Sequence, residues 1–217
     1  MAENADTLFR KAHSLMLTSS GGDRLTRAAK AMKEAADAGH AGAANNYGTM
    51  LQHGRGVAQN LALARRYYEQ AADAGQPVAQ FNLGFMWLHG LGGNADASFA
   101  RALFEKAGAQ DEPDALTYLG RMAMIGEGGP QDFEAAIDWW RRGANAGDSR
   151  CAFNLGVASA GGHGAPPDFV AAHHWFSRAL ELGSQQASAE LRRIEDVMTE
   201  QELTASGVTA NRTGPPD

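Results

Sequence analysis

The histidines are the side chains of this 217-residue chain most suited to metal binding, but their spacing does not make a site. His173 and His174 are adjacent on an expected helix, so they point about 100° apart and cannot chelate one ion from one face. His53 and His89 lie 36 residues apart, each at the end of an expected helix, and no carboxylate or cysteine completes a ligand set beside them. The sequence therefore predicts surface or packing histidines and no metal site.

No catalytic constellation emerges from the sequence either. No Ser/His/Asp set has a recognisable nucleophile context. Glu134 and Asp138 lie four residues apart on an expected helix, and a solvated helix face accounts for them better than a general acid–base couple. We therefore predict no catalytic residue, no cofactor and no enzymatic activity.

Four Gly-x-Gly segments could be mistaken for phosphate-binding loops. A dinucleotide fingerprint follows a strand and opens a helix at a sheet edge. These segments follow expected helices and recur at a fixed spacing, which favours turns between helices. Their glycines are Gly54 and Gly56, Gly90 and Gly92, Gly126 and Gly128, and Gly162 and Gly164.

The composition narrows the classes of partner. A net charge of −6 with no run of basic residues argues against nucleic acid, because a phosphate backbone needs a stripe of Lys and Arg. No stretch reaches the ~18 apolar residues of a membrane span, so no membrane insertion is predicted. The first residues are acidic and lead into no apolar run, which argues against a signal peptide and favours the cytoplasm. The single cysteine, Cys151, cannot form an intramolecular disulfide and is interpreted as a small core residue.

The chain has an internal period of 36 residues. The period is carried by four kinds of position at once, without an insertion. The glycine columns are Gly48, Gly84, Gly120, Gly156 and Gly54, Gly90, Gly126, Gly162. The aromatic column is Tyr68, Phe104, Trp140, Phe176, and the alanine column is Ala64, Ala100, Ala136, Ala172.

Each repeat is predicted to be two helices joined by a turn. In residues 76–111, apolar positions recur with a helical period over 78–89 (helix A) and again over 97–109 (helix B). A glycine inside helix A costs ~1 kcal/mol relative to alanine, so Gly84 and its equivalents require a reason. We expect that the missing Cβ lets the aromatic side chain of helix B lie against the backbone of helix A. Helix B ends at a glycine in each repeat except at Asp111, where the junction is expected to be the least regular.

The ends of the array differ from its middle, as stacked repeats require. We predict a single domain over residues 1–204, followed by a disordered tail over 205–217. Its repeats are a degenerate first unit over 4–39, four regular units over 40–75, 76–111, 112–147 and 148–183, and a capping helix over 184–204. The A helix of the last repeat is expected to be short, because it ends in Ala158-Ser159-Ala160-Gly161-Gly162.

The repeats resemble Sel-one-like repeats, relatives of the tetratricopeptide repeats. The match rests on Ala79-Gln80-Phe81-Asn82-Leu83-Gly84 in an A helix and on the B helix from Ala64 through Tyr67-Tyr68 to Gly75. The resemblance implies an all-α fold, a right-handed superhelical solenoid of about five repeats with a concave groove lined by the A helices. It also implies a bacterial scaffold or adaptor that binds proteins. Cysteine-rich relatives once described as β-lactamases suggest a hydrolase as an alternative, but their cysteine pattern is missing here; a glycan-binding module is a further alternative.

One column of the A helices is the strongest candidate for partner binding: Asn46, Asn82, Tyr118 and Asn154. Asparagine is a poor residue inside a helix, so the column calls for a purpose. Its amides either bond the backbone of a neighbouring repeat or, as in tetratricopeptide relatives, hold a partner's main chain in the groove. The neighbouring positions Phe81, Phe85, Arg121, Arg150 and Phe153 vary between repeats and suit an extended or helical peptide with apolar anchors and a carboxylate. These aromatics could equally belong to the core between repeats, and the chain is expected to be a monomer, with a dimer as the alternative.

Overall fold

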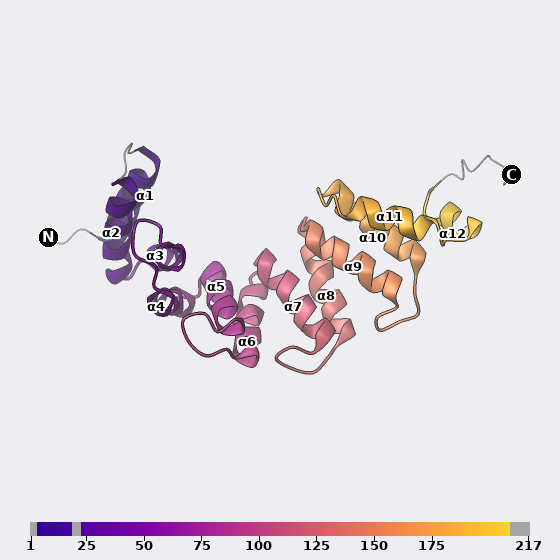
Figure 1. Cartoon of the computed structure of the whole chain (residues 1–217), viewed down its shortest axis with the longest axis horizontal. Coiled ribbons are helices and arrows are strands. Elements are labelled where there is room, and N and C mark those ends of the chain that lie inside the picture. Colours follow the sequence, from indigo (N-terminus) through magenta and orange to yellow (C-terminus); the bar gives the residue numbers. More distant parts are fainter. Residues whose placement is uncertain (1–3, 19–22, 209–217) are drawn as a thin grey trace. The chain divides into compact units, whose positions relative to one another are not determined.

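A computed structural model describes residues 4–18 and 23–208, and these residues form helices and no strands (Figure 1). The prediction of an all-α helix-turn-helix repeat fold is confirmed. Contacts divide the chain into two compact units, Met1–Ala115 (unit 1) and Leu116–Asp217 (unit 2). The helices are α1 (Ala5–Thr18), α2 (Arg24–Asp37), α3 (Ala41–His53), α4 (Leu61–Asp73), α5 (Pro77–Leu88), α6 (Ala97–Gly108), α7 (Pro113–Ile125), α8 (Phe133–Asn145), α9 (Ser149–Gly161), α10 (Phe169–Glu181), α11 (Ala187–Glu195) and α12 (Glu200–Ala205).

Consecutive helices pack in pairs that correspond to the repeats. In unit 1, α1 packs on α2, α3 on α4 and α5 on α6, and in unit 2, α9 packs on α10. The first helix of each pair is called the A helix below, and the second the B helix. The model repeat is reproduced closely, since α5 and α6 begin and end within one residue of the expected 78–89 and 97–109.

The central glycines do what the sequence predicts. A Cβ on Gly84 would lie 2.7 Å from the ring of Phe104, and one on Gly156 would lie 2.6 Å from the ring of Phe176. Both distances are too short for a real contact, so the A helix approaches its B-helix aromatic only because the Cβ is missing. Gly48 meets Tyr68 and Gly120 meets Trp140 in the same way.

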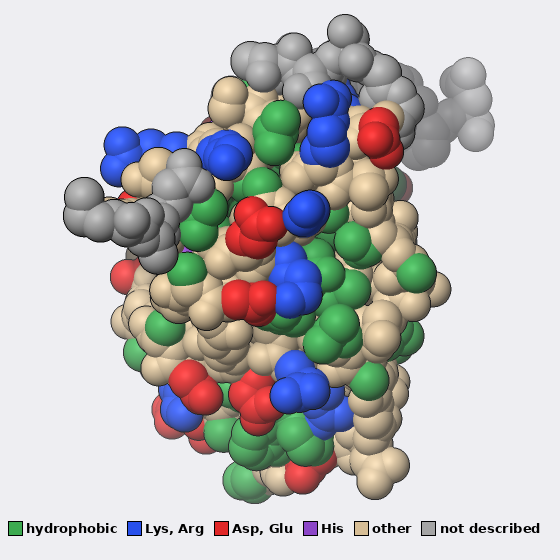
Figure 2. Space-filling view, turned by 90° about the vertical axis from the view of Figure 1, so that its left-hand side faces the viewer, with side chains coloured by type: hydrophobic (Ala, Val, Ile, Leu, Met, Phe, Trp, Pro, Cys, Tyr) green, Lys and Arg blue, Asp and Glu red, His purple; other side chains and the backbone are tan. Residues whose placement is uncertain are grey.

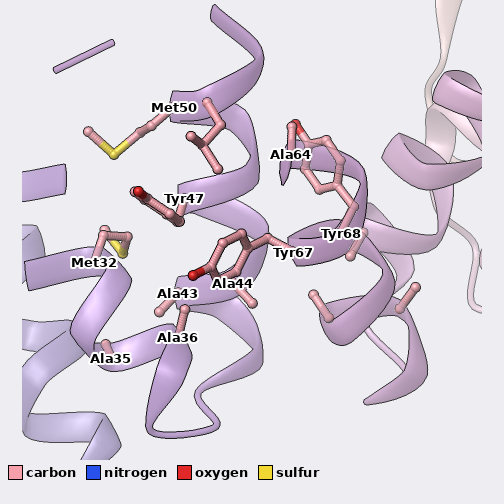
Figure 3. Close-up of a cluster of buried hydrophobic side chains, with 14 of the residues drawn as sticks. Met32, Ala35, Ala36, Ala43, Ala44, Tyr47, Met50, Ala64, Tyr67 and Tyr68 are labelled. Carbon is pink, nitrogen blue, oxygen red and sulfur yellow. The ribbon is translucent and has the colours of Figure 1, made fainter. Parts of the chain in front are cut away.

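The core of unit 1 is built from a few large side chains separated by alanines. Figure 3 shows Met32 of α2, Tyr47 and Met50 of α3 and Tyr67 of α4 turned toward one cluster. The rings of Tyr47 and Tyr67 meet edge to face at 4.8 Å, a favourable aromatic geometry. Buried alanines from α2 and α3 line the same cluster and keep the helix backbones close.

Helix starts and ends follow the repeat. The B helices α4, α6, α8 and α10 begin after Asn60, Asp96, Asp132 and Asp168, whose side chains each accept a hydrogen bond from a backbone N–H three residues on. The glycines predicted to end B helices have positive φ, from 83° at Gly75 to 99° at Gly183. At the irregular junction Asp111 takes the same conformation, with a φ of 58°. Among the residues that the structure describes, Asp111 is the only non-glycine residue with a positive φ.

Three expectations about the last repeat and the C-terminal region need correction. The A helix α9 is 13 residues long, not shortened, and Asp148 caps its start. The predicted capping helix over 184–204 is two helices, because Thr199 and Glu202 form a capping box that starts α12 anew. The expected tail begins later than 205, since Ser206–Val208 complete the end of α12. Residues 209–217 of that tail lie outside the described residues.

Candidate functional site: the A-helix face

The asparagines of unit 1 form a chain of side-chain hydrogen bonds between two A helices. Asn82 of α5 donates from Nδ2 to Oδ1 of Asn45 on α3, at 3.0 Å. Asn45 in turn donates from Nδ2 to Oδ1 of its neighbour Asn46, at 3.4 Å. The amide of Asn82 therefore bonds a neighbouring repeat, as one of the two interpretations predicts, but through a side chain in place of the backbone. Asn46 and Asn82 both remain half-buried.

The aromatic candidates of unit 1, Phe81 and Phe85, pack against neighbouring rings and keep part of their surface exposed. The ring of Phe81 lies 5.4 Å from that of the buried Phe104 and 6.4 Å from that of Phe85. Phe85 is 4.3 Å from the exposed His89. Phe81 thus serves the repeat core at least in part, whereas Phe85 lies nearer the surface histidine.

Unit 2 holds the remaining candidates. The ring of Phe153 lies 5.4 Å from the buried Phe176, an arrangement like that of Phe81. The guanidinium of Arg121 lies 5.1 Å above the ring of Tyr118 and donates to Glu127 at 3.1 Å. Tyr118, Phe153 and Asn154 are half-buried, and Arg121 is exposed.

Arg150, the other predicted positive spot, is held by a carboxylate. Its Nη2 and Nε lie 2.6 and 3.1 Å from the two oxygens of Asp148, which also caps α9. Burial alone would raise the pKa of Asp148, but the hydrogen bonds and charge of Arg150 hold that pKa below its usual value. The positive charge expected at this position is therefore largely compensated within the chain.

Cys151 lies in the core, fully buried, as predicted. Burial raises the pKa of its thiol to about 11, and the thiol lies 3.2 Å from Oγ1 of Thr117. Since the thiolate is the reactive species, this thiol is inert near neutral pH.

The histidines occupy the positions predicted for packing and surface residues. His173 is buried, with Nε2 3.1 Å from Oε1 of Glu195 on α11, whereas His174, His53 and His89 are exposed. Within the described ranges, no group of three or more His, Cys, Asp or Glu side chains is placed to hold a metal ion. The described helices also include none that is long and apolar enough to cross a membrane.

Unit 1 also has an apolar pocket with a volume of about 500 Å³, which the sequence analysis does not predict. It is lined by Met16 and Leu17 of α1, Leu25 of α2, Asn46 and Met50 of α3, and Arg55. We call it the α1–α3 pocket. The sequence predicts a degenerate first unit over 4–39, and the apolar side chains on its A helix are the signal that could have indicated a pocket.

Outside this apolar pocket, exposed acidic and basic side chains are mixed on the surface. Figure 2 shows basic and acidic side chains lying beside one another on one face, with hydrophobic side chains between them. A larger cavity of about 780 Å³ at the start of α8 repeats this mixture, since Asp132, Glu134 and Asp138 line it together with Arg141. Neither the face in Figure 2 nor this cavity has the continuous basic surface that nucleic acid requires.

Tandem helix pairs with close glycine–aromatic packing define the chain as an all-α repeat protein. The Sel1 repeat model matches residues 41–76, 77–112, 113–148 and 149–184, one residue later than the predicted boundaries, so the chain belongs to the Sel1 repeat family. Sel1 repeat proteins are generally protein-interaction scaffolds.

Solved structures share this fold. A Sel1 repeat protein from Oxalobacter formigenes is 28% identical with a TM-score of 0.79, covering 94% of this chain and 86% of that one. A protective antigen of uropathogenic Escherichia coli that displays this fold is 24% identical with a TM-score of 0.83, covering 93% of this chain but only 44% of that one. An immunity protein from Pseudomonas aeruginosa is 19% identical with a TM-score of 0.55, covering 94% of this chain and 74% of that one. No curated protein matches the chain.

Proposed function

We propose that this chain is a non-catalytic scaffold or adaptor that binds a segment of a partner protein along the face formed by its A helices. The central glycine of each A helix faces the B helix. A residue two positions earlier points about 200° away from it, because successive helical residues are 100° apart. The column Asn46, Asn82, Tyr118 and Asn154 therefore lies on the face turned away from the B helices.

The observation that carries the proposal is that this column stays half-buried and polar in both units. Asn82 bonds Asn45 of the neighbouring repeat, but the apolar core does not require polar side chains in this column, since each repeat already buries its glycine, alanine and aromatic columns. Half-buried amides can donate hydrogen bonds to a peptide main chain, and aromatic rings beside them can cover its apolar side chains. We place the proposed scaffold in the cytoplasm, where a free thiol such as Cys151 stays reduced.

The proposal is tested by finding a partner and then changing the column. The immobilised chain is exposed to a lysate of its source organism, captured proteins are identified by mass spectrometry, and the purified partner is titrated by biolayer interferometry. The double variant Asn46→Ala/Asn154→Ala changes one column residue in each unit. It is expected to bind at least about tenfold more weakly, since losing two or three hydrogen bonds to a partner removes 1.4 kcal/mol or more.

The matched control is Asn94→Ala/Asn145→Ala, which removes one exposed asparagine from each unit outside the column. The control is expected to bind like the unchanged chain, and both double variants are expected to keep its unfolding midpoint. If the column variant binds as tightly as the control, the A-helix face is not the binding surface. If turnover of a hydrolase substrate is found and a single side-chain change abolishes it, the non-catalytic assignment is wrong.

A further inference from the structure

The α1–α3 pocket gathers exposed apolar side chains at one place. Leu17 is 71% exposed, Met16 is 37% exposed and Leu25 is 36% exposed, and all three line the pocket. Met50, only 4% exposed, is also part of its wall and continues into the core cluster of Figure 3. Contiguous apolar surface of this kind is typical of a site that another molecule covers. Its volume of about 500 Å³ lies within the range of about 300–1,000 Å³ usual for ligand pockets.

A polar donor is fixed in the wall of the pocket. Asn46 is the last member of the amide chain Asn82–Asn45–Asn46, and its Oδ1 is the acceptor of that chain. This bond orients the carboxamide, and the Nδ2 of Asn46 has no hydrogen-bond acceptor among the residues that the structure describes. Two N–H groups are therefore available to an acceptor such as a peptide carbonyl.

The charge at the pocket is basic. Arg55, in the turn after α3, is exposed and lines the pocket together with His13 of α1. In the described ranges no carboxylate lines the pocket, and Arg55 has no ion pair. In contrast to Arg121 and Arg150, this guanidinium is not compensated by a carboxylate of the chain. The rim therefore favours an anionic ligand.

We propose that the α1–α3 pocket binds an acidic peptide segment of a partner protein, in which aliphatic side chains lie next to an Asp or Glu. The aliphatic side chains pack between Met16, Leu25 and Met50, and Leu17 covers them. The carboxylate pairs with Arg55, and a main-chain carbonyl accepts from Asn46. This inference rests on the proposed function, because it assigns the partner chemistry of the A-helix face in unit 1.

The probe is a set of peptides, so no natural partner has to be known. A phage-displayed library of random dodecapeptides is selected on the immobilised full chain, and an enriched sequence is synthesised with a fluorescein label. Its dissociation constant is measured by fluorescence anisotropy. Enriched sequences are expected to combine Leu, Ile or Val with an adjacent Asp or Glu.

Two surface variants test the apolar and the charged part of the pocket separately. Leu17→Ser and Arg55→Glu are each expected to weaken peptide binding by about tenfold or more. Their matched controls in the same unit are Val78→Ser, which changes another exposed apolar side chain, and Arg66→Glu, which changes another exposed arginine. Both controls are expected to bind like the unchanged chain. A peptide with Lys in place of its acidic residue is expected to regain affinity for Arg55→Glu, which a merely misfolded variant would not allow.

The outcomes separate this inference from the proposed function. If no peptide is enriched, or if enriched peptides bind the pocket variants and the controls equally, the pocket assignment is wrong. In that case a lysate partner that is lost on Asn46→Ala/Asn154→Ala but kept on Leu17→Ser would leave the scaffold function standing. A dimer in size-exclusion chromatography with light scattering that Leu17→Ser dissociates would assign the pocket to a second copy of the chain, and would also overturn the inference.

Discussion

At the residue scale, the central glycines show how one missing atom fixes the distance between two helices. The ring of Phe104 occupies the space where a Cβ on Gly84 would stand. An alanine there would favour the helix by up to ~1 kcal/mol, so the glycine is explained only by packing. The cost of the glycine is offset by complete burial of a phenylalanine ring, which is 0% exposed.

The first prediction follows from Gly84, where helix propensity favours alanine but packing against Phe104 requires glycine. Gly84→Ala is expected to destabilise the chain by about 1–3 kcal/mol, because the added methyl overpacks the core. Gly42→Ala, near the start of α3, is the matched control: its Cβ would lie 3.1 and 3.4 Å from the side chains of His40 and Gln76, farther than the 2.7 Å between a Cβ on Gly84 and Phe104. Urea unfolding followed by circular dichroism compares the two. A Gly84→Ala variant as stable as Gly42→Ala would contradict the close-packing account.

Asp148 supports a second prediction at this scale, on the dependence of stability on pH. The pKa of this carboxyl is lowered in the folded chain despite its burial, mainly by Arg150. Its stabilising contribution is therefore complete above the unfolded pKa of about 4 and is lost as the pH falls through the lower folded pKa. Asp148→Asn keeps a capping side chain but removes the charge. It is expected to cost about 1 kcal/mol near pH 7.

The measurement is urea unfolding of Asp148→Asn and of the unchanged chain at several pH values. The difference in free energy is expected to shrink as the pH falls below about 4 and the native carboxyl takes up its proton. Asp132→Asn, at the exposed cap of α8, is the control and is expected to change little at any pH. A difference for Asp148→Asn that stays the same from pH 7 to the lowest pH at which the chain still folds would contradict the assigned pairing with Arg150.

Single residues also show where sequence reasoning stops. The close packing at the glycine column could be predicted, because glycine is unfavourable inside a helix and yet recurs four times in one register. The hydrogen bond from Asn82 to Asn45 and the pairing of Arg150 with Asp148 could not, because each depends on side-chain rotamers and on the distance between neighbouring groups. The polar column could be identified from the sequence, but its partners could not.

At the element scale, the second glycine of three Gly-x-Gly turns, at Gly56, Gly92 and Gly164, packs on the repeat before it. A Cβ on Gly92 would lie 2.5 Å from the carbonyl oxygen of Leu61, at the start of the preceding B helix α4. Gly56 meets the backbone of Leu25 in the same manner, whereas Gly164 meets the side chain of Phe133. At Gly56 and Gly92 the turn therefore packs backbone to backbone on the previous repeat. The sequence correctly indicates a turn here but not this contact, because the contact spans two repeats.

This contact gives a third prediction, with a control that shares its backbone conformation. Gly92 and Gly75 both have positive φ, 75° and 83°, so alanine at either costs about 1–2 kcal/mol of conformational strain. Only Gly92 has backbone atoms within reach of the added Cβ; Gly75 has nothing within 4 Å. Gly92→Ala is therefore expected to destabilise the chain by about 2 kcal/mol more than Gly75→Ala. Equal losses of stability in thermal unfolding would show that the turn does not need close backbone contact.

The elements that sequence reasoning placed least well are those set by local polar chemistry. The division of the capping region into α11 and α12 depends on the capping box at Thr199, which a search for apolar periodicity does not detect. The capping column that starts the B helices at Asn60 and its equivalents is periodic, so the same search extended to polar residues could have found it. The α1–α3 pocket depends on exposure, which the pattern of residue types does not give.

At the scale of the whole molecule, each end of a repeat array must cover a face that an inner repeat would bury against its neighbour. In unit 2 this role falls to α11 and α12, which pack on α10. Ala187, Ile194, Met198 and Leu203 of this region are at most 6% exposed. Glu195 adds a polar contact to the buried His173.

The last prediction concerns a chain that ends at Gly183 and lacks this cover. Burying an aliphatic side chain contributes about 1.5–3 kcal/mol, so losing Ile194, Met198 and Leu203 is expected to remove several kcal/mol from unit 2. The loss also exposes apolar surface on α10, and we expect self-association in light scattering. Three of the four tryptophans, Trp139, Trp140 and Trp175, lie in unit 2, so tryptophan fluorescence in urea mainly reports this unit. A chain ending at Val208 keeps both helices and is expected to unfold at the midpoint of the full chain. If the chain ending at Gly183 shares that midpoint and stays monomeric, the capping role of α11 and α12 is wrong.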